Sequence, residues 1–231
     1  MKAEIQELVS EKKNFVFIGG AGSGKSEISI NFAIKAAKLG NRPVHLFDLD
    51  MTKPLFRSRD LEEVIEAAGV HMHYQEQFMD APTLVGGVRP LLKDKNNYTV
   101  LDIGGDYIGA RAIGGYARLL DSDDTVIYYV LNSHRPWTDS LEHIDETLSK
   151  ILEISHINLD RIKFISNPNN GSSTTEEEIV KGNDELCEML GEQFLPEFIC
   201  VKEDLCDGIE VKVNLPVFSI RPLLPAEWLK I

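Results

Sequence analysis

Cysteine is scarce in this sequence of 231 residues. The three cysteines, Cys187, Cys200 and Cys206, include no C-x-x-C pair. Their odd number and wide spacing favour reduced thiols over a disulfide or zinc framework. They also lack the spacing that iron–sulfur ligation needs. We therefore expect ordinary buried or half-buried cysteines.

Long hydrophobic runs are missing as well. No stretch approaches the length that a bilayer-spanning helix needs. Residues 1–14 are charged and lack the apolar run of a signal peptide. The last residues, interrupted by Pro222 and Pro225, do not form the pattern of a basic amphipathic helix. We expect a cytoplasmic protein without membrane attachment.

Basic residues are in the minority. The chain carries 24 lysines and arginines against 37 aspartates and glutamates, which gives a formal net charge of −13 at pH 7. A surface with this charge repels polyanions such as nucleic acid. We therefore expect no nucleic-acid partner.

The apolar residues that are present indicate an α/β fold. Short apolar runs alternate with segments of helical periodicity, and no internal repeat or low-complexity block interrupts them. This alternation is typical of a doubly wound, mostly parallel sheet with helices on both faces. Because 231 residues with 43% hydrophobic content can bury one substantial core, we expect a single domain over residues 1–231.

The alternation also predicts where the elements lie. Strands are expected at residues 14–18, 43–47, 71–74, 98–103, 125–131, 162–166, 198–201 and 217–220. Helices are expected at residues 26–39, 60–68, 81–92, 109–120, 138–154 and 175–190. Residues 221–231 are expected to form a tail across the domain, since their prolines oppose a regular element.

One glycine-rich segment predicts a phosphate-binding loop. Residues 19–26 match G-x-x-x-x-G-K-S/T in full, with a strand expected before them and a helix after them. Glycines let the backbone wrap a polyphosphate with its N–H groups pointing inward, and the helix N-terminus adds its positive dipole end. A merely tight turn would give no reason for the final lysine and serine. The predicted nucleotide-binding residues are Gly19, Gly20, Ala21, Gly22, Ser23, Gly24, Lys25 and Ser26.

The last two residues of this loop predict its chemistry. We expect the Lys25 ammonium to bridge the β and γ phosphates during catalysis. Ser26 offers a hydroxyl to Mg²⁺, which prefers oxygen ligands in octahedral geometry and keeps several waters. The expected ligand is therefore a nucleotide with Mg²⁺.

Carboxylates follow two other expected strands, where ligands of a doubly wound sheet bind. Asp102 and Gly105 form a D-x-x-G arrangement, which suits a Mg²⁺-linked aspartate followed by a backbone N–H for the γ phosphate. Asp48 and Asp50 lie on one side of an extended segment, so Asp48 could approach Mg²⁺ while Asp50 positions the attacking water. An Asx-type turn into residues 52–55 is the structural alternative for this pair.

Together these residues resemble the SIMIBI class of P-loop ATPases, with a nucleotide-binding domain of the ParA/MinD or CobQ/CobB type. Residues 48–50 with Pro54 resemble the first switch of that class, and residues 102–105 resemble the second. A bacterial set of small ATP-binding proteins is more similar still. That closer resemblance rests on residues 54–59, 104–106, 109–111, 132 and 135–136.

The resemblance implies an ATP-dependent dimer whose switches transmit the nucleotide state to a client, often a metalloenzyme, a redox partner or a cargo. It also implies that Asn167, which follows the expected strand at 162–166, hydrogen-bonds the base. A turn beside Pro168 is the alternative for Asn167. The chain contains no N-K-x-D guanine-binding motif, which favours ATP over GTP.

One position departs from the family. ParA and MinD type members carry a second lysine five residues before the P-loop lysine, and it reaches the partner subunit's nucleotide; this chain has Gly20 there. We hypothesise that Arg57 or Arg59 supplies the missing positive charge, because a guanidinium suits developing phosphoryl charge. Solvated arginines without that role are the alternative.

Two histidines could suggest a metal site. His71 and His73 alternate on one face of an expected strand, but no further histidine or cysteine cluster completes a set of ligands in the sequence. We interpret both residues as structural or exposed.

Three functions remain open at this point. The leading hypothesis is a slow Mg-dependent ATPase that acts as a nucleotide-driven switch or maturation factor for a partner protein. A small-molecule phosphotransferase or ATP-dependent ligase of the CobQ/CobB type is the alternative. A nucleotide-binding module without hydrolysis is the third. The sequence does not choose among them, because a fold of this kind serves many reactions.

Overall fold

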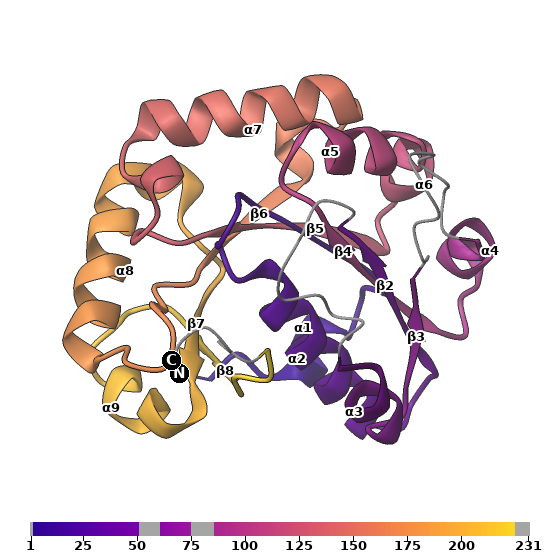
Figure 1. Ribbon diagram of the computed structural model, residues 1–231, viewed down its shortest axis with the longest axis horizontal. Helices are drawn as coiled ribbons and strands as arrows, with labels where there is room; N and C mark the ends of the chain where they lie inside the picture. The colour runs from indigo at the N-terminus through magenta and orange to yellow at the C-terminus, as the bar shows by residue number, and fades with distance from the viewer. Residues whose placement is uncertain (1, 51–60, 75–85, 225–231) are drawn as a thin grey trace, which may run out of the picture.

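The protein is described here by a computed structural model of residues 2–50, 61–74 and 86–224. Within these ranges one sheet has the strand order β3-β2-β4-β1-β5-β6-β7-β8, and its neighbouring strands are parallel (Figure 1). The strands are β1 (Asn14–Ile18), β2 (Val44–Leu49), β3 (Val70–His73), β4 (Tyr98–Ile103), β5 (Thr125–Leu131), β6 (Ile162–Ser166), β7 (Phe198–Lys202) and β8 (Val217–Ile220). The predicted parallel α/β sheet is confirmed.

Helices cover both faces of this sheet. Figure 1 shows α5, α6 and α7 along one face and α1, α2 and α3 along the other. The helices are α1 (Ile5–Leu8), α2 (Lys25–Lys38), α3 (Glu62–Ala67), α4 (Val88–Lys93), α5 (Tyr107–Gly114), α6 (Ala117–Leu120), α7 (Leu141–Ser155), α8 (Glu176–Leu190) and α9 (Cys206–Glu210). The fold is therefore doubly wound, as the sequence predicts.

The central strand β1 is buried from both sides. Val16 and Ile18 belong to the core beneath α5 and α7, whereas Phe15 and Phe17 belong to the opposite core with α2. On the α2 side, the Phe32 ring centroid lies 4.6 Å from that of Phe15 and 5.4 Å from that of Phe17. Aromatic pairs at such separations add about 0.5–1.5 kcal/mol each beyond the area they bury. These two cores fix β1 and so fix the start of the loop that follows it.

Two predicted helices differ from their expected bounds on the α5–α7 face. The helix expected at 109–120 is interrupted, because α5 ends at the tandem glycines Gly114 and Gly115 before α6 begins. α5 also begins earlier than expected, since the Asp106 carboxylate caps it by accepting the Gly109 N–H at 2.9 Å. α7 begins at residue 141 rather than 138, where Ser140 caps its first turn.

The remaining differences concern short elements. α4 begins only after Gly87, whose φ of 87° is left-handed. The helix expected at 81–92 is therefore wrong at residues 86 and 87, which precede α4. Residues 81–85 lie outside the described part. The sequence does not predict α1 or α9. Helices of four and five residues are too short to show helical periodicity.

The end of the described chain lies on α2. Asn31 exchanges two hydrogen bonds with the backbone of Arg221, at 2.9 and 2.8 Å. The Glu27 carboxylate accepts the N–H groups of Leu223 and Leu224 at 2.6 and 3.1 Å. Burial raises the pKa of Glu27, and these N–H groups oppose the rise. Residues 221–224 therefore cross α2, whereas the rest of the expected tail lies outside the described residues.

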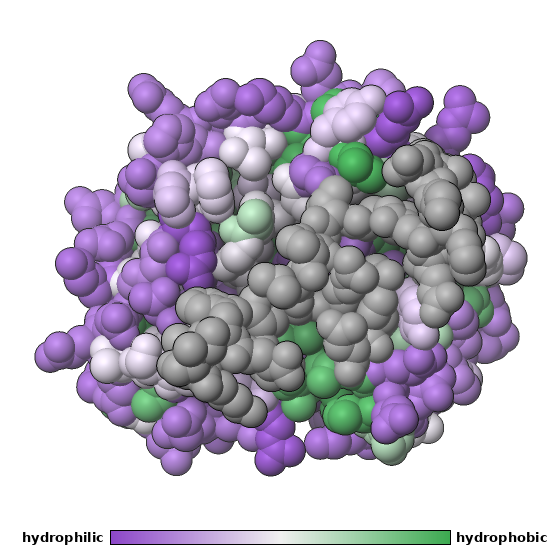
Figure 2. Space-filling view, viewed as in Figure 1, coloured by the Kyte–Doolittle hydropathy of each residue, from purple (hydrophilic) through white to green (hydrophobic). Residues whose placement is uncertain are grey.

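The surface is largely polar. Figure 2 shows hydrophilic side chains over most of the described part of this face, with hydrophobic residues in small groups between them. In the described residues, no helix combines the length and the hydropathy that crossing a membrane requires.

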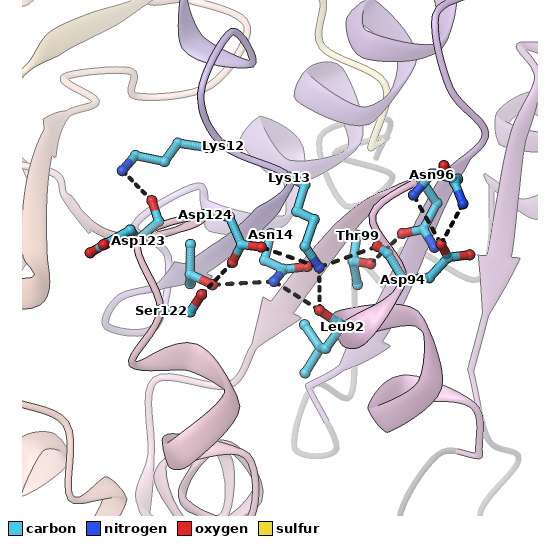
Figure 3. Close-up of polar contacts among 12 residues, drawn as sticks. Lys12, Lys13, Asn14, Leu92, Asp94, Asn96, Thr99, Ser122, Asp123 and Asp124 are labelled. Atoms are coloured by element: carbon cyan, nitrogen blue, oxygen red, sulfur yellow. Dashed lines mark hydrogen bonds and ion pairs between the residues drawn. The ribbon is translucent and has the colours of Figure 1, made fainter.

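A polar network closes the edge of the sheet where the parallel strands begin (Figure 3). The residue Lys13 is only 4% exposed. Its ammonium donates to the carbonyl oxygens of Leu92 and Asp94 and lies 3.6 Å from the Asp124 carboxylate. Asn14 donates its side-chain amide to the same Leu92 carbonyl at 3.2 Å. The network ties β1 to the segments that precede β4 and β5.

Three histidines gather at the β2–β3 edge. His45 Nδ1 lies 2.9 Å from His73 Nε2, and the His45 ring stacks on His71 with centroids 4.9 Å apart. Burial first, then the charges of His73 and His71, lower the pKa of His45 from 6.5 to about 4. The pKa of His73 is lowered for the same reasons. The sequence shows that His71 and His73 share one face of a strand. Only the register between β2 and β3 brings His45 beside them.

Replacing Lys13 by alanine should destabilise the fold by about 1–3 kcal/mol, because buried acceptors lose their donor. Lys12→Ala is the matched control: the half-buried Lys12 also donates to a backbone carbonyl, that of Asp123, at 2.6 Å, and its loss should cost about 0–1 kcal/mol. Urea unfolding measures both values. Equal losses in the two variants would contradict the structural role of the network.

The histidine group should make stability depend on pH. Because the folded pKa of His45, about 4, lies below its ordinary 6.5, the unfolded chain takes up the proton first, and stability falls as pH drops from about 6.5 to about 4. His45→Gln should flatten this slope in thermal unfolding scans. His143→Gln should not flatten it, since Asp139 raises the pKa of the exposed His143. An unchanged slope in His45→Gln would refute the assignment.

Candidate functional site

The glycine-rich loop joins β1 to α2 at the centre of the sheet. β1 ends at Ile18, and α2 begins at Lys25. Gly22 (φ 72°) and Gly24 (φ 91°) both have a left-handed backbone conformation, which residues with a Cβ rarely adopt. The strand, loop and helix that the motif predicts are therefore present, and the loop opens at the N-terminus of a 14-residue helix.

Sheet order brings the predicted carboxylates to this loop. β4 lies between β1 and β2, so the ends of β2 and β4 reach the loop together. The Lys25 ammonium lies 2.9 Å from Asp50 Oδ2, with both side chains at least 95% buried. The Ser26 hydroxyl donates to Asp102 Oδ2. The two final residues of the motif are thus each bound to a different acidic segment.

Asp48 completes this acidic group. It is the register partner of Asp102 on the adjacent strand, so both carboxylates lie on the same face of the sheet. Its Oδ1 also accepts the Asp50 N–H at 3.2 Å, which is an Asx-type contact. Residues 52–55, into which the alternative turn is expected to lead, lie outside the described residues. The ligand role and the turn role are therefore compatible in geometry.

The donor set fits Mg²⁺ in the presence of a nucleotide. Asp48 and Asp102 are nearly fully buried, and the Ser26 hydroxyl lies against one of them. Two carboxylates and a hydroxyl are oxygen ligands of the kind that Mg²⁺ takes while phosphates and waters fill the other positions. Across the described residues, no group of three or more histidine, cysteine, aspartate or glutamate side chains is arranged to hold a metal alone.

The segment after β4 touches the loop through glycine. A Cβ on Gly105 would overlap the carbonyl oxygen of Gly19. A Cβ on Gly104 would lie 3.0 Å from Asp50 Oδ1. Only residues without a side chain allow the P-loop, the end of β2 and the start of α5 to approach this closely.

Two side chains from the segment after β5 donate to carbonyl groups of the P-loop. Trp137 Nε1 donates to the carbonyl of Ala21 at 3.0 Å, and Arg135 Nε donates to that of Gly22 at 3.0 Å. From the sequence, residues 132–136 with Arg135 and Trp137 lie at a strand end and are candidates to contact the nucleotide or a client protein. The sequence does not predict their bonds to the P-loop. Their signal is their position at the carboxyl end of β5, which borders β1.

Asn167 contacts the same loop after β6. Its Nδ2 donates to the Ser23 carbonyl at 2.6 Å, and its Oδ1 accepts from Asn169 at 2.6 Å. The side-chain amide therefore joins β6 to the P-loop. The predicted contact of Asn167 with a base stays a prediction.

Trp137 also lies beside Gly20, the position where this chain lacks the second lysine of ParA and MinD type proteins. A Cβ built on Gly20 would lie 3.3 Å from Trp137 Cδ1. The indole thus occupies space beside the position where the related ATPases carry their second lysine. Arg57 and Arg59, which the sequence offers in its place, lie outside the described residues.

The close contact of Gly105 predicts a sensitive position. Gly105→Ala should weaken nucleotide binding by about tenfold or more, because overpacking of about 1–3 kcal/mol is relieved only by moving the loop. Gly115→Ala is the control, since its Cβ would meet Ala112 O at an ordinary 3.4 Å and its φ of −61° suits alanine. Calorimetric titration measures both. Equal affinities in the two variants would contradict the close packing.

Comparisons with solved structures agree with this fold. The chain resembles FtsY from Elizabethkingia anophelis in complex with GDP (TM-score 0.53, 14% identity, 82% of this chain and 57% of that chain). It also resembles FtsY from Mycoplasma mycoides (TM-score 0.52, 13% identity, 84% of this chain and 62% of that chain). The chain thus spans less than two thirds of either FtsY chain, and at these identities the likeness concerns the fold.

The sequence comparisons identify the family. No curated protein matches the chain. The model of the CobQ/CobB/MinD/ParA nucleotide-binding domain matches residues 15–212, from β1 to just beyond α9. This P-loop protein of the SIMIBI class therefore belongs to the CobQ/CobB/MinD/ParA nucleotide-binding domain family.

Proposed function

We propose that this protein is a Mg-dependent ATPase that works as a nucleotide-driven switch or maturation factor for a partner protein. One observation carries the proposal: the last two residues of the P-loop are bound directly to the two acidic segments. Lys25 pairs with Asp50, and Ser26 donates to Asp102. Any ligand that engages Lys25 and Ser26 therefore acts on both segments at once.

In the proposed reaction, Lys25 binds the β and γ phosphates and Asp50 orients the attacking water. The Gly105 N–H binds the γ phosphate. Ser26, Asp48 and Asp102 hold Mg²⁺. The ion, when bound, neutralises charge on the phosphate oxygens.

The switch follows from competition for one ammonium group. Phosphate oxygens attract Lys25 as Asp50 does, so nucleotide binding weakens the hold of Lys25 on the segment after β2. Gly105, packed on Gly19, links the same event to the start of α5. Hydrolysis reverses both changes, which a partner protein can sense at α5 and at the segment after β2.

ATP is the proposed nucleotide, since the chain lacks the N-K-x-D motif that reads guanine. Asn167 is proposed to contact the base from the end of β6. Dimerisation, if the protein shares it with its family, cannot use a lysine at position 20. Arg57 or Arg59 is proposed to supply the positive charge.

Asp50→Asn tests the reaction. Loss of the group that positions water should lower the rate of phosphate release by about 100-fold or more, while ATP still binds. The matched control is Asp139→Asn, which alters an exposed aspartate paired with His143. Phosphate release and calorimetric titration with Mg·ATP measure the two effects. Wild-type turnover in Asp50→Asn would refute the role of Asp50.

The ATP-trapped Asp50→Asn protein also tests the switch. A partner that binds it with ATP but not with ADP, and that stimulates wild-type hydrolysis, would support the switch. Turnover that requires a metabolite and no protein would instead favour the phosphotransferase or ligase. Tight ATP binding with no turnover under any condition would leave a binding module.

A further inference from the structure

Three consecutive carbonyl groups of the P-loop are each held by a side chain from outside the loop. The Ala21 carbonyl accepts from Trp137, the Gly22 carbonyl from Arg135, and the Ser23 carbonyl from Asn167, at 3.0, 3.0 and 2.6 Å. The donors come from the segments after β5 and β6, and each lies 113 to 144 positions further along the chain than the residue whose carbonyl it binds. We call these three donors the carbonyl clamp.

The clamp also fixes backbone N–H groups. A trans peptide is planar, and its C=O and N–H point in opposite directions. Holding the Ala21 carbonyl outward therefore turns the Gly22 N–H inward, and holding the Ser23 carbonyl does the same for the Gly24 N–H. The N–H between them, that of Ser23, donates to the Gly20 carbonyl at 3.2 Å and closes the turn.

We propose that Trp137 and Asn167 are positioning residues that hold the Gly22 and Gly24 N–H groups in the orientation that binds phosphate. Arg135 positions the peptide between them, whose Ser23 N–H closes the turn. The inference rests on the proposed nucleotide site. A loop rich in glycine has many other backbone conformations, and ordering it costs about 1–2 kcal/mol per residue. Because the clamp orders the loop when the protein folds, its N–H donors are already oriented before the nucleotide binds.

The clamp residues are themselves held in place. Arg135 Nη1 donates to Asn170 Oδ1 at 3.1 Å, and Asn169 fixes the Asn167 amide by donating to its Oδ1. The Asn167 Nδ2 lies so close to Gly24 that a Cβ there would overlap it. Asn167 and the left-handed Gly24 therefore depend on each other.

Trp137 offers a direct spectroscopic test. The chain contains two tryptophans, Trp137 and Trp228, so Trp228→Phe leaves Trp137 as the single tryptophan. Because the Trp137 N–H binds the P-loop backbone, Mg·ATP should change the intensity or wavelength of its emission. Unchanged emission at a Mg·ATP concentration that saturates the site would overturn the contact of Trp137 with the nucleotide-binding loop.

Affinity tests the positioning role. Trp137→Phe keeps a ring over Gly20 but removes the donor, and it should raise the Kd for Mg·ATP or Mg·GTP about 5- to 10-fold, as loss of one hydrogen bond predicts. Arg135→Gln should act similarly. Arg89→Gln is the matched control: Arg89 also donates to a backbone carbonyl, that of Gly115, at 2.8 Å, and its loss should leave the Kd unchanged.

The outcomes separate this inference from the proposed function. Raised Kd values in the two clamp variants, with thermal stability near that of Arg89→Gln, would support the clamp. Kd values equal to wild type would overturn the clamp and leave nucleotide binding intact. If neither ATP nor GTP bound the wild type, or if Lys25→Ala bound as tightly as the wild type, the proposed phosphate site would be wrong and the clamp with it.

Discussion

The buried ion pair between Lys25 and Asp50 is the interaction around which this site is organised. Both side chains are almost completely removed from water, with 2.9 Å between ammonium and carboxylate. Taking two charges out of water is costly, and a buried pair of this kind is often no more stabilising than apolar residues of the same volume. Breaking one leaves an uncompensated charge. The Lys25–Asp50 pair suits the proposed function, in which Lys25 exchanges Asp50 for the phosphates of the nucleotide.

That pair exists because of the order of the strands. The chain runs from β1 outward to β2 and β3, and then returns to place β4 between β1 and β2. The helices after β1 and β4 pack on opposite faces of the sheet. The carboxyl ends of β1, β2 and β4 therefore meet where the covering helices diverge, which is where open α/β sheets bind their ligands.

The other side of the loop is held by β5 and β6. Trp137 lies beside Gly20, where ParA and MinD type relatives have a lysine, and its N–H is bound to the next residue of the loop. A tryptophan that contacts this loop from the segment after β5 brings a hydrogen bond and a large apolar ring, but no positive charge. The family fold is thus kept while a tryptophan lies beside Gly20.

The sequence by itself determined the α/β class, five strands with their bounds, and the loop at residues 19–26, because these depend on local apolar runs and on residue spacing along the chain. It also picked out Asp48, Asp50 and Asp102 as residues at strand ends. It missed the carbonyl clamp, in which Arg135, Trp137 and Asn167 hold the loop, and the association of His45 with the other histidines. Only the tertiary structure decided those, because strand order and register determine which residues far apart in sequence become neighbours.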